Sequence, residues 1–279
     1  MSKPKPEIGI LQKYIDDAMI VAHQKQERRK YLGASRWGED CSRKLAYEYH
    51  GQKADAPFAG RTLRIFNCGH DGEERMADYL RLAGFELQTH TAEGKQIGMS
   101  DAEGKFKGHL DGVIHAGPLT DLKYPMLWEN KALGQKSWSD VVKKGIKLSK
   151  PVYYAQVQIY MAYHELESCM FTCLNRDTGE IHVELIPLVA RDAQDYVDKA
   201  VRIVTSANPE ELGRIGKGAD DFACKFCDYK KRCHAPLVIT GTTVFSTPAP
   251  NQWLGSAPKQ DTVIFHPEHK NITPTWLKK

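Results

Sequence analysis

Two short apolar runs, each carrying an acidic residue, constrain the fold of this chain more than any other feature. Residues 108–114 contain Asp111, and residues 126–131 contain Glu129 and Lys131. A Gly-Pro pair between them is typical of a turn, so the runs are predicted to form a β-hairpin. Because side chains alternate across a strand, Glu129 and Lys131 share one face. The sequence therefore predicts two carboxylates and an ammonium around a common point at one end of a sheet.

Two carboxylates held side by side repel each other unless a cation lies between them. Hard oxygen ligands favour magnesium or manganese, and these ions activate water and neutralise a phosphodiester during hydrolysis. A nearby lysine, here Lys131, then holds or helps to deprotonate the attacking water. The competing interpretation is that both strands simply carry surface charges, since Glu-x-Lys is a common strand sequence.

Composition places the chain among ordinary globular proteins, with 279 residues, of which 41% are hydrophobic and 27% charged. No apolar run is long enough to span a membrane, and the first residues lack the apolar core of a signal peptide, so we expect a cytoplasmic protein without a membrane partner. The net charge of +4 is only mildly basic. Local basic clusters suit phosphate contacts or solvated helix faces equally, at residues 25–30, 143–150 and 225–232.

Apolar periodicity and turn signals predict the secondary structure. Helices are expected at residues 8–31, from 41 onward, and at 61–84, 151–163 and 190–207. Strands are expected at residues 85–91, 96–100, 169–174 and 181–186, besides the hairpin. The Lys-rich stretch after residue 131 is interpreted as a connection that crosses a DNA-binding face.

Cysteine spacing predicts a second site. Cys224, Cys227 and Cys233 form a compact Cys-x2-Cys-x5-Cys module, and three thiolates at this spacing bind one metal centre when a fourth ligand arrives from elsewhere. Seven cysteines in a cytoplasmic chain argue against a disulfide framework. Of the others, Cys169 and Cys173 lie in a predicted strand and are expected to be buried core thiols.

Asp111 followed by Glu129-Asn130-Lys131 resembles the Asp…Glu-x-Lys signature of the PD-(D/E)XK nucleases. Gln156 and Tyr160, four apart on one helix face, are similar to the Gln-x-x-x-Tyr motif of the RecB-like exonuclease branch. That resemblance implies that Asp111, Glu129 and the Asn130 carbonyl bind Mg²⁺ or Mn²⁺, that Lys131 positions the nucleophilic water, and that Gln156 and Tyr160 border the active site.

The first motif of the family supplies a further metal ligand from a helix. The Gly-x-x-x-Glu spacing from Gly69 favours Glu73. His70 stays the alternative, because residues three apart share a helix face. Aromatic residues of the same region, Trp138 or Tyr154, are expected to stack on bases.

Family members with an iron–sulfur cluster take one cysteine upstream of the core and three near the C-terminus. The resemblance therefore implies that Cys41 joins Cys224, Cys227 and Cys233 around a 4Fe–4S cluster, with zinc on the same thiolates as the alternative. Ser35 and Arg43, in the segment around Cys41, are candidates for contacting DNA phosphates.

The resemblance covers residues 33–234 and implies an α/β fold, a mixed sheet flanked by helices with the active site at one edge and the cysteine module beside it. The expected organisation is an N-terminal helical region (1–60), a nuclease core (61–207), the cysteine module (208–235) and a Pro/Thr/Ser-rich tail (236–279). The expected activity is DNA hydrolysis, exonucleolytic on single strands or ends. A silent DNA-binding or scaffold subunit with a recombination or CRISPR-adaptation partner, and an endonuclease, are the alternatives.

Overall fold

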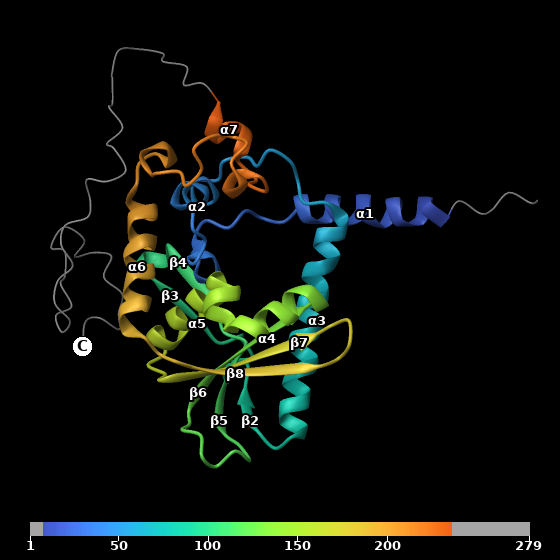
Figure 1. Ribbon diagram of the computed structural model, residues 1–279, viewed down its shortest axis with the longest axis vertical. Coiled ribbons are helices and arrows are strands. Elements are labelled where there is room, and N and C mark those ends of the chain that lie inside the picture. Colours follow the sequence, from blue (N-terminus) through green and yellow to red (C-terminus); the bar gives the residue numbers. More distant parts are fainter. Residues whose placement is uncertain (1–7, 236–279) are drawn as a thin grey trace, which may run out of the picture.

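The computed structural model describes residues 8–235 and shows helices grouped around two small sheets (Figure 1). The helices are α1 (Ile8–Gln24), α2 (Ser42–Tyr49), α3 (Gly60–Leu82), α4 (Gln135–Ser149), α5 (Pro151–Tyr163), α6 (Ala190–Thr205) and α7 (Lys230–His234). The strands are β1 (Leu32–Gly33), β2 (Glu86–Gln88), β3 (Gly98–Asp101), β4 (Phe106–His109), β5 (Gly112–Ala116), β6 (Met126–Leu133), β7 (Ser168–Asn175) and β8 (Ile181–Pro187). Four short 3-10 turns complete the described chain, at Ala34–Arg36, Ala102–Gly104, Pro209–Glu211 and Phe222–Cys224.

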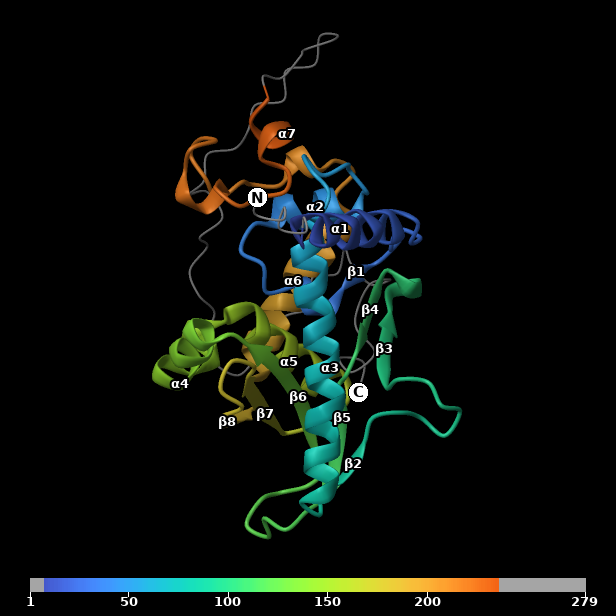
Figure 2. The same cartoon turned by 90° about the vertical axis from the view of Figure 1, so that its right-hand side faces the viewer.

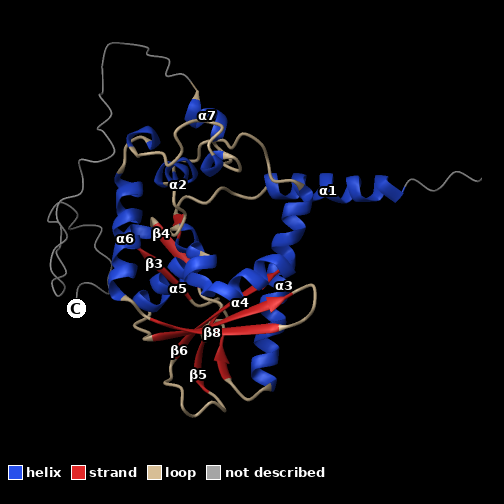
Figure 3. Cartoon of the chain, in the orientation of Figure 1, coloured by secondary structure: helices blue, strands red, loops and turns tan. Residues whose placement is uncertain are grey.

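The strands, red in Figure 3, form two sheets. The larger sheet has the strand order β2-β5-β6-β7-β8, and the smaller one β1-β4-β3. The predicted hairpin is confirmed as the antiparallel pair β5–β6, with Gly112 opposite Trp128. β6 and β7 pair in parallel. A parallel pair needs a crossover, and α4 and α5 supply it. The larger sheet is therefore mixed and flanked by helices, which confirms the coarse α/β prediction.

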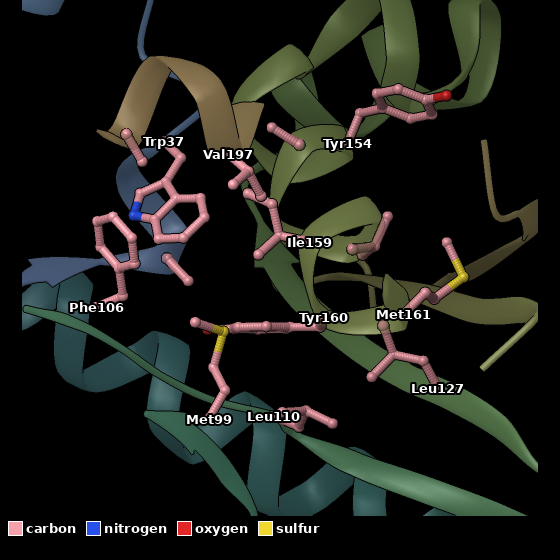
Figure 4. Packing of buried hydrophobic residues seen from close by; sticks show 14 of the residues in the cluster. Trp37, Met99, Phe106, Leu110, Leu127, Tyr154, Ile159, Tyr160, Met161 and Val197 are labelled. Atoms are coloured by element: carbon pink, nitrogen blue, oxygen red, sulfur yellow. The ribbon is translucent and has the colours of Figure 1, made fainter. Parts of the chain in front are cut away.

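Helices cover both faces of β6, the middle strand of the larger sheet. On one face lies the long helix α3 (Figure 2), where the Asn130 side chain donates a hydrogen bond to the Gly72 carbonyl. On the other face lies α5, where Gln156 reaches Glu129. The main apolar core includes Trp37, Phe106, Leu127, Ile159 and Tyr160 (Figure 4).

Three predictions need correction. The first helix ends at Gln24, not near residue 31. The stretch after Lys131 is not an open connection but the helix α4, because its apolar residues Val141 and Ile146 are fully buried behind a lysine-rich outer surface. The acidic residues lie at the centre of the sheet and not at its edge, since the parallel strand β7 pairs with β6 on the side away from β5.

Within residues 8–235, no helix is both long and apolar enough to cross a membrane. The predicted tail at residues 236–279 lies outside the described residues.

Candidate active site and cysteine cavity

Glu129 is the most buried member of the acidic group, with none of its surface exposed. Its Oε1 atom forms an ion pair with Lys131 Nζ on the same face of β6, and Gln156 Nε2 donates to the same oxygen at 2.5 Å. Among residues 8–235 the other oxygen, Oε2, has no hydrogen-bond partner. A buried polar atom without a partner is rare, and an oxygen of an ionised carboxylate can only accept. A cation or a water molecule would satisfy it.

Asp111 lies directly before β5, beside Glu129 on the neighbouring strand. It is 8% exposed, and its Oδ2 atom accepts a hydrogen bond from the Asn130 backbone N–H at 2.8 Å. Lys131 Nζ donates to the Asn130 carbonyl at 3.1 Å. The structure therefore brings Asp111, Glu129 and Lys131 together, as strand alternation predicts.

Both predicted ligands on α3 lie on the side of the helix near this group. Glu73 is half-buried, and the charges of Asp111 and Lys131 shift its pKa. His70 is exposed, and its charge lowers the pKa of Asp111. Glu73 therefore lies deeper in the protein than His70.

Burial and mutual repulsion shift the protonation of the site. Burial, followed by the charge of Asp111, raises the pKa of Glu129 to about 8 and that of Glu73 to about 7. Burial also raises the pKa of Asp111. Burial alone would lower the pKa of Lys131, but the charges of Glu129 and Asp111 outweigh it and raise that pKa. The group is thus short of positive charge although Lys131 stays protonated.

Gln156 and Tyr160 lie on the face of α5 that looks onto β6, as their spacing predicts. Tyr160 is buried in the core (Figure 4). A Cβ atom at Gly108 would lie only 2.7 Å from the Tyr160 ring, so glycine is required there. Both side chains therefore hold the chain's own groups in place: Gln156 holds Glu129, and Tyr160 holds the segment that leads into Asp111.

The two predicted stacking residues are engaged elsewhere. Trp138 is half-buried and donates from Nε1 to the Cys173 carbonyl at 3.0 Å, and the buried Tyr154 donates to Asp192 at 2.7 Å. The aromatic residue at the site is instead Tyr153, whose ring centroid lies 5.3 Å from Lys131 Nζ. Its position three residues before Gln156 was the sequence signal for it.

The two candidates for phosphate contacts near Cys41 differ in their surroundings. Ser35 is half-buried in the 3-10 turn after β1. Arg43 donates from Nε to the Leu212 carbonyl at 2.6 Å and from Nη2 to the Glu210 carbonyl at 2.8 Å. These bonds tie α2 to the start of the cysteine module (208–235), and they give no support to a phosphate contact.

The four predicted cluster ligands line a single cavity of about 180 Å³. Cys41 enters it from the N-terminus of α2, while Cys224, Cys227 and Cys233 come from the segment around α7. Figures 1 and 2 both show these two parts of the chain side by side. The cations Lys44, Arg214 and Lys230 also line the cavity, and the predicted core thiols Cys169 and Cys173 are buried in β7.

Neither the carboxylates nor the cysteines converge closely on one point. In the part of the chain that the structure describes, no three His, Cys, Asp or Glu side chains are arranged to hold a metal ion. For the carboxylates this spacing follows from their repulsion and from the bonds that Lys131 and Asn130 make with them.

No protein-family model matches the sequence, and no curated protein matches it. The fold is similar to solved structures at low identity. An alkaline exonuclease, LHK-Exo from Laribacter hongkongensis, matches with a TM-score of 0.46 and 16% identity, over 67% of this chain and 90% of that chain. The same exonuclease in complex with dAMP matches with a TM-score of 0.46 and 15% identity, with the same coverage. The protein SSO0001 matches with a TM-score of 0.49 and 15% identity, over 82% of this chain and 98% of that chain. These likenesses are distant, so function is argued below from the side chains of this chain.

Proposed function

We propose that the chain is a metal-dependent nuclease that hydrolyses phosphodiester bonds of DNA, as an exonuclease acting on single strands or ends. The observation that carries the proposal is the buried Oε2 atom of Glu129, which has no partner among the described residues although it lies beside Asp111 and Lys131. A chain does not retain a buried charge cluster of this kind for stability, because its desolvation and repulsion are unfavourable.

The donor set fits a divalent cation. Asp111, Glu129 and Glu73 offer carboxylate oxygens, and the Asn130 carbonyl offers a neutral one, which are the ligands that magnesium and manganese prefer. When bound, such an ion neutralises the carboxylates, lowers the pKa of a water molecule and stabilises charge on a phosphate. A bound cation also favours the ionised carboxylates, which reverses the upward pKa shifts of Glu73 and Glu129.

The other residues of the site orient and hold charge. Lys131 Nζ, fixed by Glu129 and the Asn130 carbonyl, provides a protonated donor that can orient a water molecule and counter the negative charge developing on phosphate. Gln156 fixes the Glu129 oxygen that faces Lys131. The Tyr153 ring covers one side of the ammonium and limits its movement.

Digestion of end-labelled single-stranded, duplex and closed-circular DNA with Mg²⁺ or Mn²⁺ tests this proposal. Lys131→Ala should lower the cleavage rate of linear DNA on the order of 100-fold, because one preorganised charge at the reacting phosphate is lost. The matched control is Lys123→Ala, which removes an exposed lysine whose ion pair with Glu167 lies on the surface. That control should cut at the wild-type rate.

Cleavage of closed circles would make the protein an endonuclease. If the wild-type protein binds DNA but cuts no substrate with either ion, the nuclease proposal is wrong and a binding subunit takes its place.

We further propose that Cys41, Cys224, Cys227 and Cys233 hold a 4Fe–4S cluster. The support is that Cys41 and the three cysteines of the distant module line one cavity. A cluster spans several ångströms and is held by four separated thiolates, whereas a zinc ion needs all four at one point. Zinc on the same four thiolates is the alternative.

Metal and sulfide analysis of protein purified without oxygen separates the two. The cluster predicts four irons and four sulfides per chain with broad visible absorption, all lost in Cys227→Ser. One zinc per chain and a colourless protein would support the alternative.

A further inference from the structure

We propose that the side chain of Asn130, held by Thr172 and Trp128, is the positioning element that sets the place of Glu73 relative to Asp111 and Glu129. The inference rests on the proposed metal-dependent function, and it concerns the face of β6 that points away from the reacting groups. Asn130, Thr172 and Trp128 are almost fully buried, and none of them is expected to touch substrate.

Three hydrogen bonds connect these residues in one direction. Trp128 Nε1 donates to Thr172 Oγ1 at 3.0 Å, Thr172 Oγ1 donates to Asn130 Oδ1 at 2.9 Å, and Asn130 Nδ2 donates to the Gly72 carbonyl at 3.3 Å. Each role is fixed by chemistry, because an indole N–H only donates and a carbonyl only accepts. The Thr172 hydroxyl group accepts from Trp128, so it donates its single hydrogen to Asn130 Oδ1. The Nδ2 end of the Asn130 amide therefore faces the Gly72 carbonyl.

The relay ends on the residue next to a predicted metal ligand. Gly72 precedes Glu73 on α3, and a Cβ atom at Gly72 would lie 2.7 Å from the Ala132 side chain on β6. Helix α3 and strand β6 therefore approach as closely as a glycine allows. The hydrogen bond from the Asn130 amide fixes the position of α3 along β6. A shift of α3 would carry Glu73 away from Asp111 and Glu129.

All four polar groups of Asn130 take part in this arrangement. Its backbone N–H binds Asp111 and its carbonyl binds Lys131, while its side chain binds Gly72 and Thr172. The middle residue of the Glu-x-Lys motif therefore links the strand that carries Glu129, the turn that carries Asp111 and the helix that carries Glu73. An amide is required there, because the site needs both a donor and an acceptor in one flat group.

Thr172→Val tests the relay without touching the metal ligands. Valine has nearly the shape of threonine but cannot hold the Asn130 amide. We expect calorimetric titration without DNA to show Mn²⁺ affinity about 10-fold weaker, as is typical when a group that orients a ligand is removed. The Mn²⁺ concentration for half-maximal cleavage should rise by the same factor, while the rate at saturating Mn²⁺ stays near that of the wild type.

Two variants serve as controls. Thr172→Ser keeps the hydroxyl group and should bind Mn²⁺ within about twofold of the wild type. Thr205→Val makes the same chemical change on α6, where the hydroxyl group bonds to the backbone of its own helix, and should leave Mn²⁺ affinity unchanged.

If Thr172 has a purely structural role, Thr172→Val should have a lower melting temperature but an unchanged Mn²⁺ affinity in the folded state. This result would overturn the inference about Asn130 and leave the proposed nuclease function standing. If the wild-type protein neither binds Mn²⁺ nor cuts DNA, both the inference and the proposed function are wrong.

Discussion

The carboxylate site and the cysteine cavity are held in place in opposite ways. Glu129 lies on the central strand β6 and Asp111 directly before its neighbour β5, and hydrogen bonds from Asn130, Gln156 and Lys131 fix these two carboxylates within the core. The cysteines come from distant parts of the chain and share a cavity whose described walls are short turns and the five-residue helix α7. The chain's own hydrogen bonds hold the first site, while the second would gain much of its order from the centre proposed for it.

Besides the bonds from Arg43 to Glu210 and Leu212, hydrogen bonds and one ring contact join the cysteine module to the N-terminal region. The Asp55 backbone N–H donates to the Asp228 carbonyl at 2.7 Å, and the Lys231 backbone N–H donates to the Asp55 carboxylate at 2.8 Å. Tyr47 packs against Tyr229 with ring centroids 5.2 Å apart. Such contacts contribute about 1 kcal/mol each, so a centre bound by four thiolates would dominate the attachment of the module.

Removing one ligand from each site should therefore have opposite effects on stability. Cys41→Ser is expected to lower the melting temperature on the order of 10 °C, because several kcal/mol of metal-binding free energy is also folding free energy. Asp111→Asn is expected to leave it unchanged or raise it, since a buried charge disappears while the amide oxygen still accepts from Asn130. Differential scanning calorimetry without divalent ions measures both.

The control for the cysteine change is Cys68→Ser, which alters an exposed thiol on α3 that does not line the cavity. It should melt with the wild type. If Cys41→Ser and Cys68→Ser melt at the same temperature, the cysteine centre does not join the two parts of the chain, and the contrast between the sites disappears.

Local patterns in the sequence predicted the parts of the site that depend on spacing alone. Strand alternation placed Glu129 and Lys131 on one face, and the four-residue helical repeat placed Gln156 and Tyr160 together on α5. The hairpin followed from a turn signal, and this brought Asp111 beside Glu129. Each of these inferences needs only the geometry of one element or of two adjacent strands.

The parts that depend on pairing between distant segments could not be predicted. Thr172 meets Asn130 only because β7 pairs in parallel with β6, in a register that no local pattern specifies. The same pairing moves the site from the edge of the sheet to its centre. The helix α4 was missed because many lysines surround its few buried residues, and the engagement of Tyr154 with Asp192 required knowing where α6 lies.

A pH series sharpens the comparison with a smaller effect. Burial raises the pKa of Glu129 from 4.5 to about 8, and that of Glu73 from 4.5 to about 7. An acid with a higher pKa in the folded state binds more protons there than in the unfolded state. Its contribution to stability is therefore complete below the unfolded value and is lost as the pH rises through the folded one. The melting temperature without divalent ions should fall from about pH 5 to about pH 8.

The melting temperature of Glu129→Gln should fall less steeply over the same pH range, because this variant lacks one of the two carboxyl groups whose pKa is raised. Mn²⁺ should stabilise the wild-type protein more at the upper end of the range than at the lower end, since at low pH it competes with the protons that the carboxylates hold. A thermal shift assay across the range, with and without Mn²⁺, measures both trends. Equal slopes for the wild type and Glu129→Gln would mean that Glu129 is ionised in the metal-free protein, and that the carboxylate site does not carry the electrostatic cost that sets it apart from the cysteine cavity.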